Sequence, residues 1–163
     1  MKKCILIMGF PVKLSDIIEV IEIQTDEASS FLNKKTGEIV TFNREDFEAA
    51  ENQDDLDEYP EWQRESIKTA QEILDHEEDF IGLPAKYDVD EYQIMEKFII
   101  SVKDREISDA LHSAIKGKGA FRRFKDGIIR FDIEDDWYKY REEAIKQVAI
   151  DWCELNEIVF KDK

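Results

Sequence analysis

The feature that most constrains the fold is the spacing of apolar residues, which recur every three or four positions over long stretches of the chain. The pattern is clearest over residues 134–156, where charged side chains such as Glu142 and Lys146 fill the intervening positions. This spacing is typical of a helix with one buried face, and it predicts a helix over 134–156. The expected apolar stripe of this helix consists of Trp137, Ala144, Ile145, Val148, Trp152 and Leu155.

Five further segments begin with a residue suited to a helix start and continue with apolar residues at helical spacing. The starting residues are Ser15, Asn43, Pro60, Asp90 and Asp104. They predict helices over 16–24, 44–51, 61–76, 91–101 and 105–116, the last ended by Gly117. Over 16–24 the β-branched residues make a strand nearly as plausible. Apolar residues at spacings of three and four predict another short amphipathic helix over 121–131.

Each predicted helix has one apolar face, so the helices are expected to share a core. The side chains expected to point inward are Ile17, Ile18, Ile21, Trp62, Ile67, Ala70, Ile73, Leu74, Tyr92, Met95, Phe98, Ile99, Val102, Ile107, Leu111, Ala114, Ile115, Phe121, Phe124, Ile128 and Phe131.

Residues 30–42 predict a β-hairpin. Two short β-prone runs flank a turn that has Asn33 at its start and Gly37 near its end, which suits a type I turn closed by a left-handed glycine. We therefore expect an α+β fold, predominantly helical, with several packed helices and one small antiparallel β-hairpin. A single globular domain is expected over 12–158. Residues 1–11 are expected to be a short N-terminal extension, a strand or an unstructured leader, and translation could start at Met8 instead of Met1.

The net charge of −16, from 23 basic and 39 acidic side chains, limits the kinds of partner that the chain can bind. A content of 11% aromatic residues with only six Gly and three Pro argues against disorder. The negative charge disfavours duplex DNA and anionic membranes within a Debye length of about 8 Å, and it favours a basic partner. No segment has the length of a membrane span, so we expect no membrane and a cytoplasmic location. The oligomeric state stays open.

No residue set predicts catalysis, a metal site or a cofactor. The acidic runs 52–59 and 88–90 lack the glycine of a calcium loop and are expected to be solvated. The two histidines, His76 and His112, lie on separate predicted helices, without a placed nucleophile, and are expected on polar faces. Cys4 and Cys153 lie far apart and outside any C-x-x-C motif, which favours a reduced cytosolic protein.

The segment 116–130 is basic inside an acidic chain. It holds six basic residues against Asp126, a local charge of +5 that leaves −21 elsewhere. Two interpretations stay open. Its arginines could form structural ion pairs with carboxylates, while its glycines serve as a helix stop and a turn. Alternatively, the segment could bind an anion or a partner at a helix N-terminus. The candidate binding residues are Lys118, Arg122, Arg123, Lys125 and, from an aromatic stretch over 137–141, Arg141.

Four stretches carry a family resemblance: 59–63 (YPEWQ), 91–98, 117–126 (GKGAFRRFKD) and 136–141 (DWYKYR). Together they resemble uncharacterised protein family 0158, a bacterial family, from about Val12 to Asn156. The first eleven residues look additional to the family pattern. The resemblance implies a bacterial, cytoplasmic, single-domain protein, and it implies no activity, cofactor or catalytic residue.

These features leave three functional hypotheses. The first is a non-enzymatic interaction or regulatory protein with an acidic body and one basic patch. The second is a binder of a phosphorylated small molecule or of RNA through residues 116–130. In that case Phe121 and Phe124 could stack on bases if exposed, although their helical spacing favours the core. The third is an enzyme of unknown class.

Overall fold

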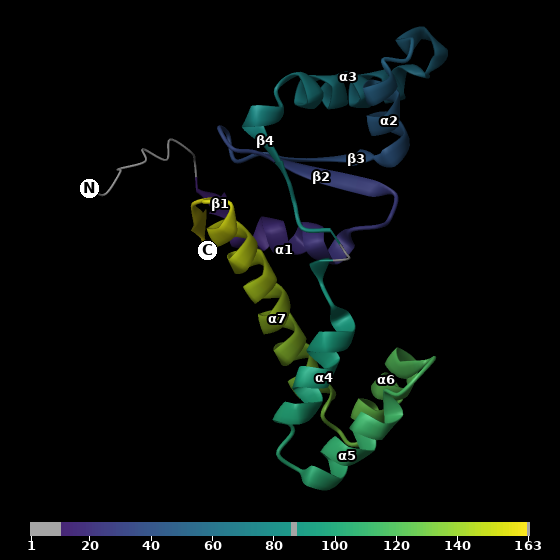
Figure 1. Cartoon of the computed structure of the whole chain (residues 1–163), viewed down its shortest axis with the longest axis vertical. Helices are drawn as coiled ribbons and strands as arrows, with labels where there is room; N and C mark the ends of the chain where they lie inside the picture. The colour runs from purple at the N-terminus through teal and green to yellow at the C-terminus, as the bar shows by residue number, and fades with distance from the viewer. Residues whose placement is uncertain (1–10, 86–87, 163) are drawn as a thin grey trace, which may run out of the picture. The chain divides into compact units, whose positions relative to one another are not determined.

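The computed structural model describes residues 11–85 and 88–162, and this part of the chain divides into two compact units. Unit 1 comprises residues up to 88 together with 149–163, and unit 2 comprises Val89–Val148. The fold is α+β and predominantly helical, as the sequence predicts (Figure 1). The single domain expected over 12–158 stays a prediction. The expected extension falls almost wholly on residues 1–10, outside the described residues.

Unit 1 contains a three-stranded antiparallel sheet of order β3-β2-β4. Its strands are β2 (Ala28–Asn33), β3 (Ile39–Asn43) and β4 (Phe80–Gly82). The predicted hairpin is confirmed as β2 and β3, with Phe31 opposite Val40 and with Gly37 in the left-handed region at φ 75°. The third strand, β4, was not predicted, because three residues are too few to show alternation.

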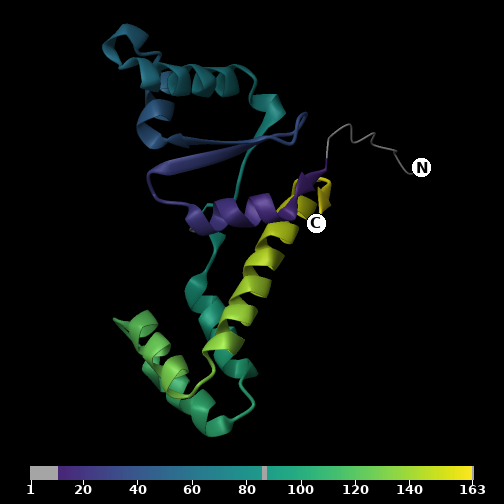
Figure 2. The same cartoon turned by 180° about the vertical axis from the view of Figure 1, so that it is seen from behind.

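Helices cover this sheet. On one side lie α2 (Arg44–Asn52) and α3 (Glu61–Asp75), and on the other lies α1 (Leu14–Ile23) (Figures 1 and 2). Two 3₁₀ turns, η1 (Leu56–Glu58) and η2 (Glu77–Asp79), flank α3. A second sheet pairs β1 (Val12–Lys13) with β5 (Phe160–Lys161) in parallel. The core between the first sheet and its helices consists of Phe42, Ala49, Ala50, Ile67, Ala70 and Ile73.

Buried polar contacts join α2 to α3. The carboxylate of Asp46 is 3% exposed and accepts hydrogen bonds from Gln63 Nε2 at 2.8 Å and Ser66 Oγ at 2.7 Å. Both oxygens of this buried acid therefore have a donor, which offsets the cost of removing it from water.

Unit 2 is helical. It consists of α4 (Glu91–Ser101), α5 (Arg105–Ala114), α6 (Ala120–Arg130) and the first part of α7 (Glu134–Leu155), a helix that continues into unit 1. Three aromatic rings meet edge-to-face in its core, with Phe98 and Phe124 centroids 5.3 and 4.7 Å from Trp137. The caps predicted for α4 and α5 are confirmed, since Asp90 accepts from the backbone of Gln93 and Asp104 from that of Ile107.

Several details of the predicted elements are wrong. The predicted helix over 16–24 is confirmed against the alternative of a strand, but it begins at Leu14, so the predicted cap from Ser15 is wrong. Asn43 stands at the start of α2 without a cap hydrogen bond from its side chain. Four side chains expected in the core are exposed: Trp62 is 73% exposed, Tyr92 38%, Phe121 46% and Leu155 83%.

Candidate binding surface on the α5–α6 hairpin

A short loop between two packed helices positions the basic segment. Gly117 and Gly119 both have positive φ angles, 78° and 77°, which side chains other than glycine rarely adopt. They end α5 and begin α6 within a few residues, so α6 folds back on α5. Gly127 allows the close approach, because a Cβ there would lie 2.6 Å from Leu111 Cδ2.

Arg123 is structural, but its partners are not the carboxylates that the sequence suggested. Its guanidinium donates to the backbone carbonyls of Ala114 at 2.7 Å, Lys116 at 2.7 Å and Lys118 at 2.5 Å. Carbonyls at the end of a helix lack intrahelical partners, and a planar guanidinium can satisfy several of them at once. Arg123 therefore holds the loop in place through three of its N–H donors.

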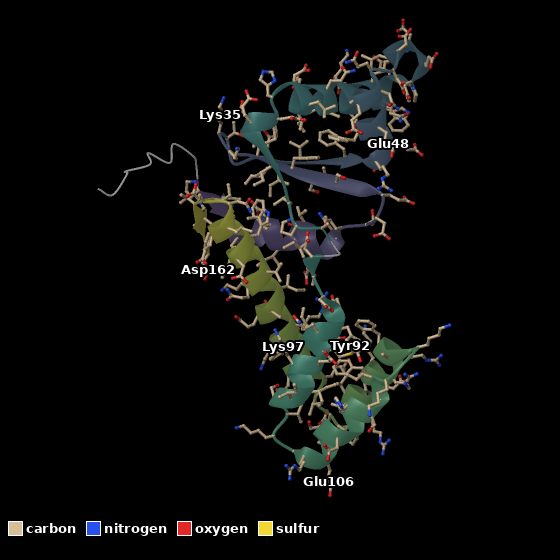
Figure 3. The ribbon with its side chains drawn as sticks, in the orientation of Figure 1. Lys35, Glu48, Tyr92, Lys97, Glu106 and Asp162 are labelled. Atoms are coloured by element: carbon tan, nitrogen blue, oxygen red, sulfur yellow. The ribbon has the colours of Figure 1, made fainter. Side chains whose placement is uncertain are left out.

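The remaining basic side chains of the segment lie on the surface. Lys118, Arg122 and Lys125 are all exposed, and none of them has a salt bridge within residues 11–85 and 88–162. Figure 3 shows side chains with nitrogen tips projecting outward from α6 and the loop before it. The first turn of α6 contains no acidic residue, so the partial positive charge of the helix N-terminus adds to this field.

Apolar side chains share this outer face of α6. Phe121 is 46% and Ile129 59% exposed, and they stand eight residues apart, about 12 Å along a helix. Lys125 lies midway between them in sequence, and all three share one side because residues four apart lie on the same face. We call Lys118, Phe121, Arg122, Lys125 and Ile129 the α6 face.

Tyr92, at the start of α4, borders the same loop. Its hydroxyl donates to the carbonyl of Ile115 at 3.1 Å while its ring stays partly exposed. A second aromatic surface therefore lies beside the basic loop (Figure 3).

The structure places Arg141 elsewhere. This residue belongs to α7, where its guanidinium binds the carboxylate of Glu91 with an Nη2–Oε1 distance of 2.6 Å and both Nε–Oε distances at 3.2 Å. This bidentate pair joins α7 to α4, so Arg141 is not one of the surface cations of the α6 face. Trp137, from the same stretch, is in the core, as expected.

Charge is divided between the two units. Unit 2 holds 12 basic and 13 acidic residues, a net charge of −1, whereas unit 1 holds 11 basic and 26 acidic residues, a net charge of −15. The α6 face therefore belongs to a nearly neutral unit, and the long-range repulsion of anions comes from the other unit.

Other candidate chemistry lies apart from this face. His76 and His112 are both exposed. No cluster of three or more metal-ligating side chains occurs in the described chain, and none of the helices found there is long and apolar enough to cross a membrane. Cys153 is buried and unpaired, and burial raises the pKa of its thiol to about 11, so the thiol is protonated at neutral pH. Cys4 lies outside the described residues.

All five residues of the α6 face lie in the basic segment 116–130, but the sequence made only Lys118, Arg122 and Lys125 candidate binding residues, expected Phe121 in the core and gave no role to Ile129. A signal was present, because Phe121, Lys125 and Ile129 form a stripe of their own beside the buried stripe of Phe124 and Ile128. Five apolar residues in eleven positions exceed what one buried stripe of a short helix needs.

Comparison with known proteins gives one family. A model described as "Uncharacterised protein family (UPF0158)" matches residues 10–163, which include both units and the whole α5–α6 hairpin. The chain is similar to the UPF0158 protein PA5073 of Pseudomonas aeruginosa, with 29% identity over 66 residues. This match covers 40% of the chain and 43% of the relative, so it spans less than half of that protein. No solved structure matches the chain.

Proposed function

Because this chain belongs to the uncharacterised protein family UPF0158, we propose a function from its own residues: it is a non-enzymatic interaction protein that binds an acidic surface of another protein through the α6 face. The observation that carries the proposal is the combination of exposed cations with exposed apolar side chains on one side of α6. Arginine and aromatic residues are enriched in protein interfaces, whereas isolated lysines on a solvated surface are not.

The geometry favours a partner surface over a small substrate. Phe121 and Ile129 project from a helix and can enter pockets of a partner, which is how helix-borne anchors bind. The neighbouring Lys118, Arg122 and Lys125 suit a partner that carries carboxylates around such pockets. Complementary charges of this kind mainly raise association rates and specificity, so binding should weaken with salt.

The division of charge supports this arrangement. With a net charge of −1, unit 2 repels an acidic partner very little, while the −15 of unit 1 repels other polyanions that approach from elsewhere. An acidic partner is therefore expected on unit 2 and not on unit 1.

A capture experiment with charge-reversed variants tests the proposal. Tagged protein is exposed to bacterial lysate at low and at physiological salt, and captured proteins are identified by mass spectrometry. The test variant carries Arg122→Glu and Lys125→Glu. The control carries Lys97→Glu and Lys103→Glu, which changes the net charge by the same amount. Both lysines are exposed, Lys97 on α4 and Lys103 just after the end of α4. Figure 3 shows Lys97 on the side of α4 away from α6.

We expect an acidic partner that is retained by the wild type and by the control but lost with the test variant. Equal capture by the test variant and the wild type would refute the role of the α6 face. Equal loss with both variants would show that capture follows net charge, and it would also refute the proposal.

The exposure of Phe121 favours a second candidate, binding of single-stranded RNA or of a phosphorylated ligand. An exposed ring among cations can stack on a base, and exposure is the condition that the sequence hypothesis set for Phe121. A thermal-shift series with short RNA and nucleotides tests it. A ligand at a hundred times its Kd stabilises the native state by about 2.7 kcal/mol. The shift should disappear with Phe121→Ala and persist with Tyr138→Ala, a control ring exposed to a similar degree on α7.

A further inference from the structure

Unit 1 contains a pocket, open to solvent, that the proposed function does not use. It has a volume of about 650 Å³, is lined by residues of α2 and α3 and the residue after α2, and has Glu51, Gln53 and Asp75 exposed at its surface. This volume falls within the range of roughly 300–1,000 Å³ that small-molecule sites occupy. Its lining combines two carboxylates, two side-chain amides and two apolar residues: Glu51, Asp75, Gln53, Gln71, Ala50 and Leu74.

Both helices present their C-terminal ends to the cavity. Ala50 and Glu51 belong to the last turn of α2, and Leu74 and Asp75 to the last turn of α3. The C-terminus of a helix carries a partial negative charge that basic side chains normally compensate. Neither of these last turns contains a basic residue, and each contributes a carboxylate to the cavity instead. The field inside the cavity is therefore uncompensated and favours a bound cation.

The wall of the cavity formed by Gln53 is fixed. This residue has a left-handed backbone at φ 56°, which non-glycine residues adopt uncommonly, and its N–H donates to the carbonyls that end α2, including that of Ala50 at 3.2 Å. The following N–H, from Asp54, donates to the carbonyl of Ala49 at 3.0 Å. The backbone that carries the Gln53 side chain is therefore fixed before a ligand binds, which reduces part of the entropic cost of binding.

We propose that this cavity binds a linear aliphatic polyamine. Glu51 and Asp75 are acceptors for two separate ammonium groups, and the amide oxygens of Gln53 and Gln71 can accept further N–H bonds. Ala50 and Leu74 supply apolar contact for the methylene chain between the ammonium groups. A metal ion fits the lining less well, because only two carboxylates contribute and a calcium ion takes six to eight oxygen ligands.

Polyamine binding in this pocket would not involve the α6 face, but general attraction of cations to the acidic unit could produce a similar signal. A unit with a net charge of −15 attracts any cation to its surface, so binding of a polyamine by itself proves nothing about the cavity. The test must separate the lining carboxylates from other carboxylates on the same two helices.

Isothermal titration calorimetry with putrescine and with spermidine at physiological salt provides the test. The lining variant carries Glu51→Gln and Asp75→Asn. The control variant carries Glu45→Gln and Glu72→Gln, which remove the same charge from exposed positions on α2 and α3 outside the lining. We expect the Kd to rise at least tenfold in the lining variant and less than twofold in the control. Equal weakening of both, or no saturable binding to the wild type, would overturn the inference.

A second measurement uses only the wild-type protein, so it does not depend on whether a variant folds. In the wild-type protein, putrescine should shift the side-chain amide NMR signals of Gln53 and Gln71, while that of the control amide Gln93 on α4 in unit 2 stays in place. Magnesium chloride at equal ionic strength should leave all three signals unchanged. If magnesium reproduces the shifts of Gln53 and Gln71, the effect is the general ion atmosphere and the cavity is not a polyamine site.

Discussion

Replacing Arg123 with alanine removes the three hydrogen bonds that fix the loop between α5 and α6. The guanidinium donates to carbonyls of three residues spread from the end of α5 to the start of α6: Ala114, Lys116 and Lys118. Without it these carbonyls must turn to water, and the two glycines of the loop regain freedom that the contacts now suppress.

The magnitude follows from these contacts. Hydrogen bonds from a charged donor contribute about 1.5–3 kcal/mol each in protected sites. Arg123 is exposed, so water replaces much of each bond and a net value near 0.5–1 kcal/mol is appropriate. Three such bonds give a loss of about 2 kcal/mol. For a chain of this length, a loss of about 2 kcal/mol lowers the Tm by roughly 4–8 °C.

Urea unfolding followed by near-ultraviolet circular dichroism measures the effect, because Trp137 lies in the core of the unit that contains the loop. Arg122→Ala is the matched control. Its side chain is exposed with no described salt bridge, so its removal should change the unfolding free energy by less than about 0.5 kcal/mol. Arg123→Lys should lose most of the stability that Arg123→Ala loses, because one ammonium cannot reach three carbonyls as a planar fork does.

Two results would refute this reasoning. If Arg122→Ala costs as much as Arg123→Ala, the arginines act through general charge and not through the loop carbonyls. If Arg123→Lys keeps wild-type stability, the positive charge is what matters, and pairing with carboxylates becomes the better explanation.

Four further predictions follow from burial. Trp62→Phe should remove most of the fluorescence that acrylamide quenches and change the unfolding free energy by less than about 0.5 kcal/mol, because this indole is 73% exposed. Asp46→Ala leaves two side-chain donors of α3 without their buried acceptor, and urea unfolding should show a loss of about 2–3 kcal/mol. Gly127→Ala should lower the Tm, since the new Cβ would meet the fully buried Leu111 at 2.6 Å, and overpacking of about 1–3 kcal/mol exceeds the gain in helix propensity of about 1 kcal/mol. The pKa of the Cys153 thiol is about 11 in the folded chain and 9.0 ordinarily. Between pH 9 and pH 11 the folded state therefore keeps the thiol proton that the unfolded state loses. Stability is then lost as the pH rises from 9 to 11, by roughly 2–3 kcal/mol, and a Cys153→Ala variant with the same alkaline slope would contradict this assignment.

Local signals predicted most of the helices correctly. The helices that begin after Asp90 and Asp104 start where their caps place them, and α3 begins directly after Pro60. The hairpin was predictable from Asn33 and Gly37 for the same reason, because a turn depends on the few residues within it. The family resemblance, which depends on short stretches of sequence, is confirmed by the match over residues 10–163.

The binding surface was predicted only in outline. Composition located the basic segment and its candidate residues, including Lys118, Arg122 and Lys125. It could not show that Arg123 is bound to the loop backbone or that Arg141 pairs with Glu91, fifty residues away. Partners of a long side chain depend on which elements meet in space, and no local pattern contains that information.

The sequence by itself determined which segments are helical and that the chain carries one concentrated block of positive charge, because spacing, caps and charge are properties of neighbouring residues. Only the tertiary structure decided which apolar side chains are buried. Trp62, Phe121 and Leu155 each lie at helical spacing with core residues, yet all three are exposed. A helix presents more apolar surface than its neighbours can cover, and the position of those neighbours is set by the packing of the whole unit.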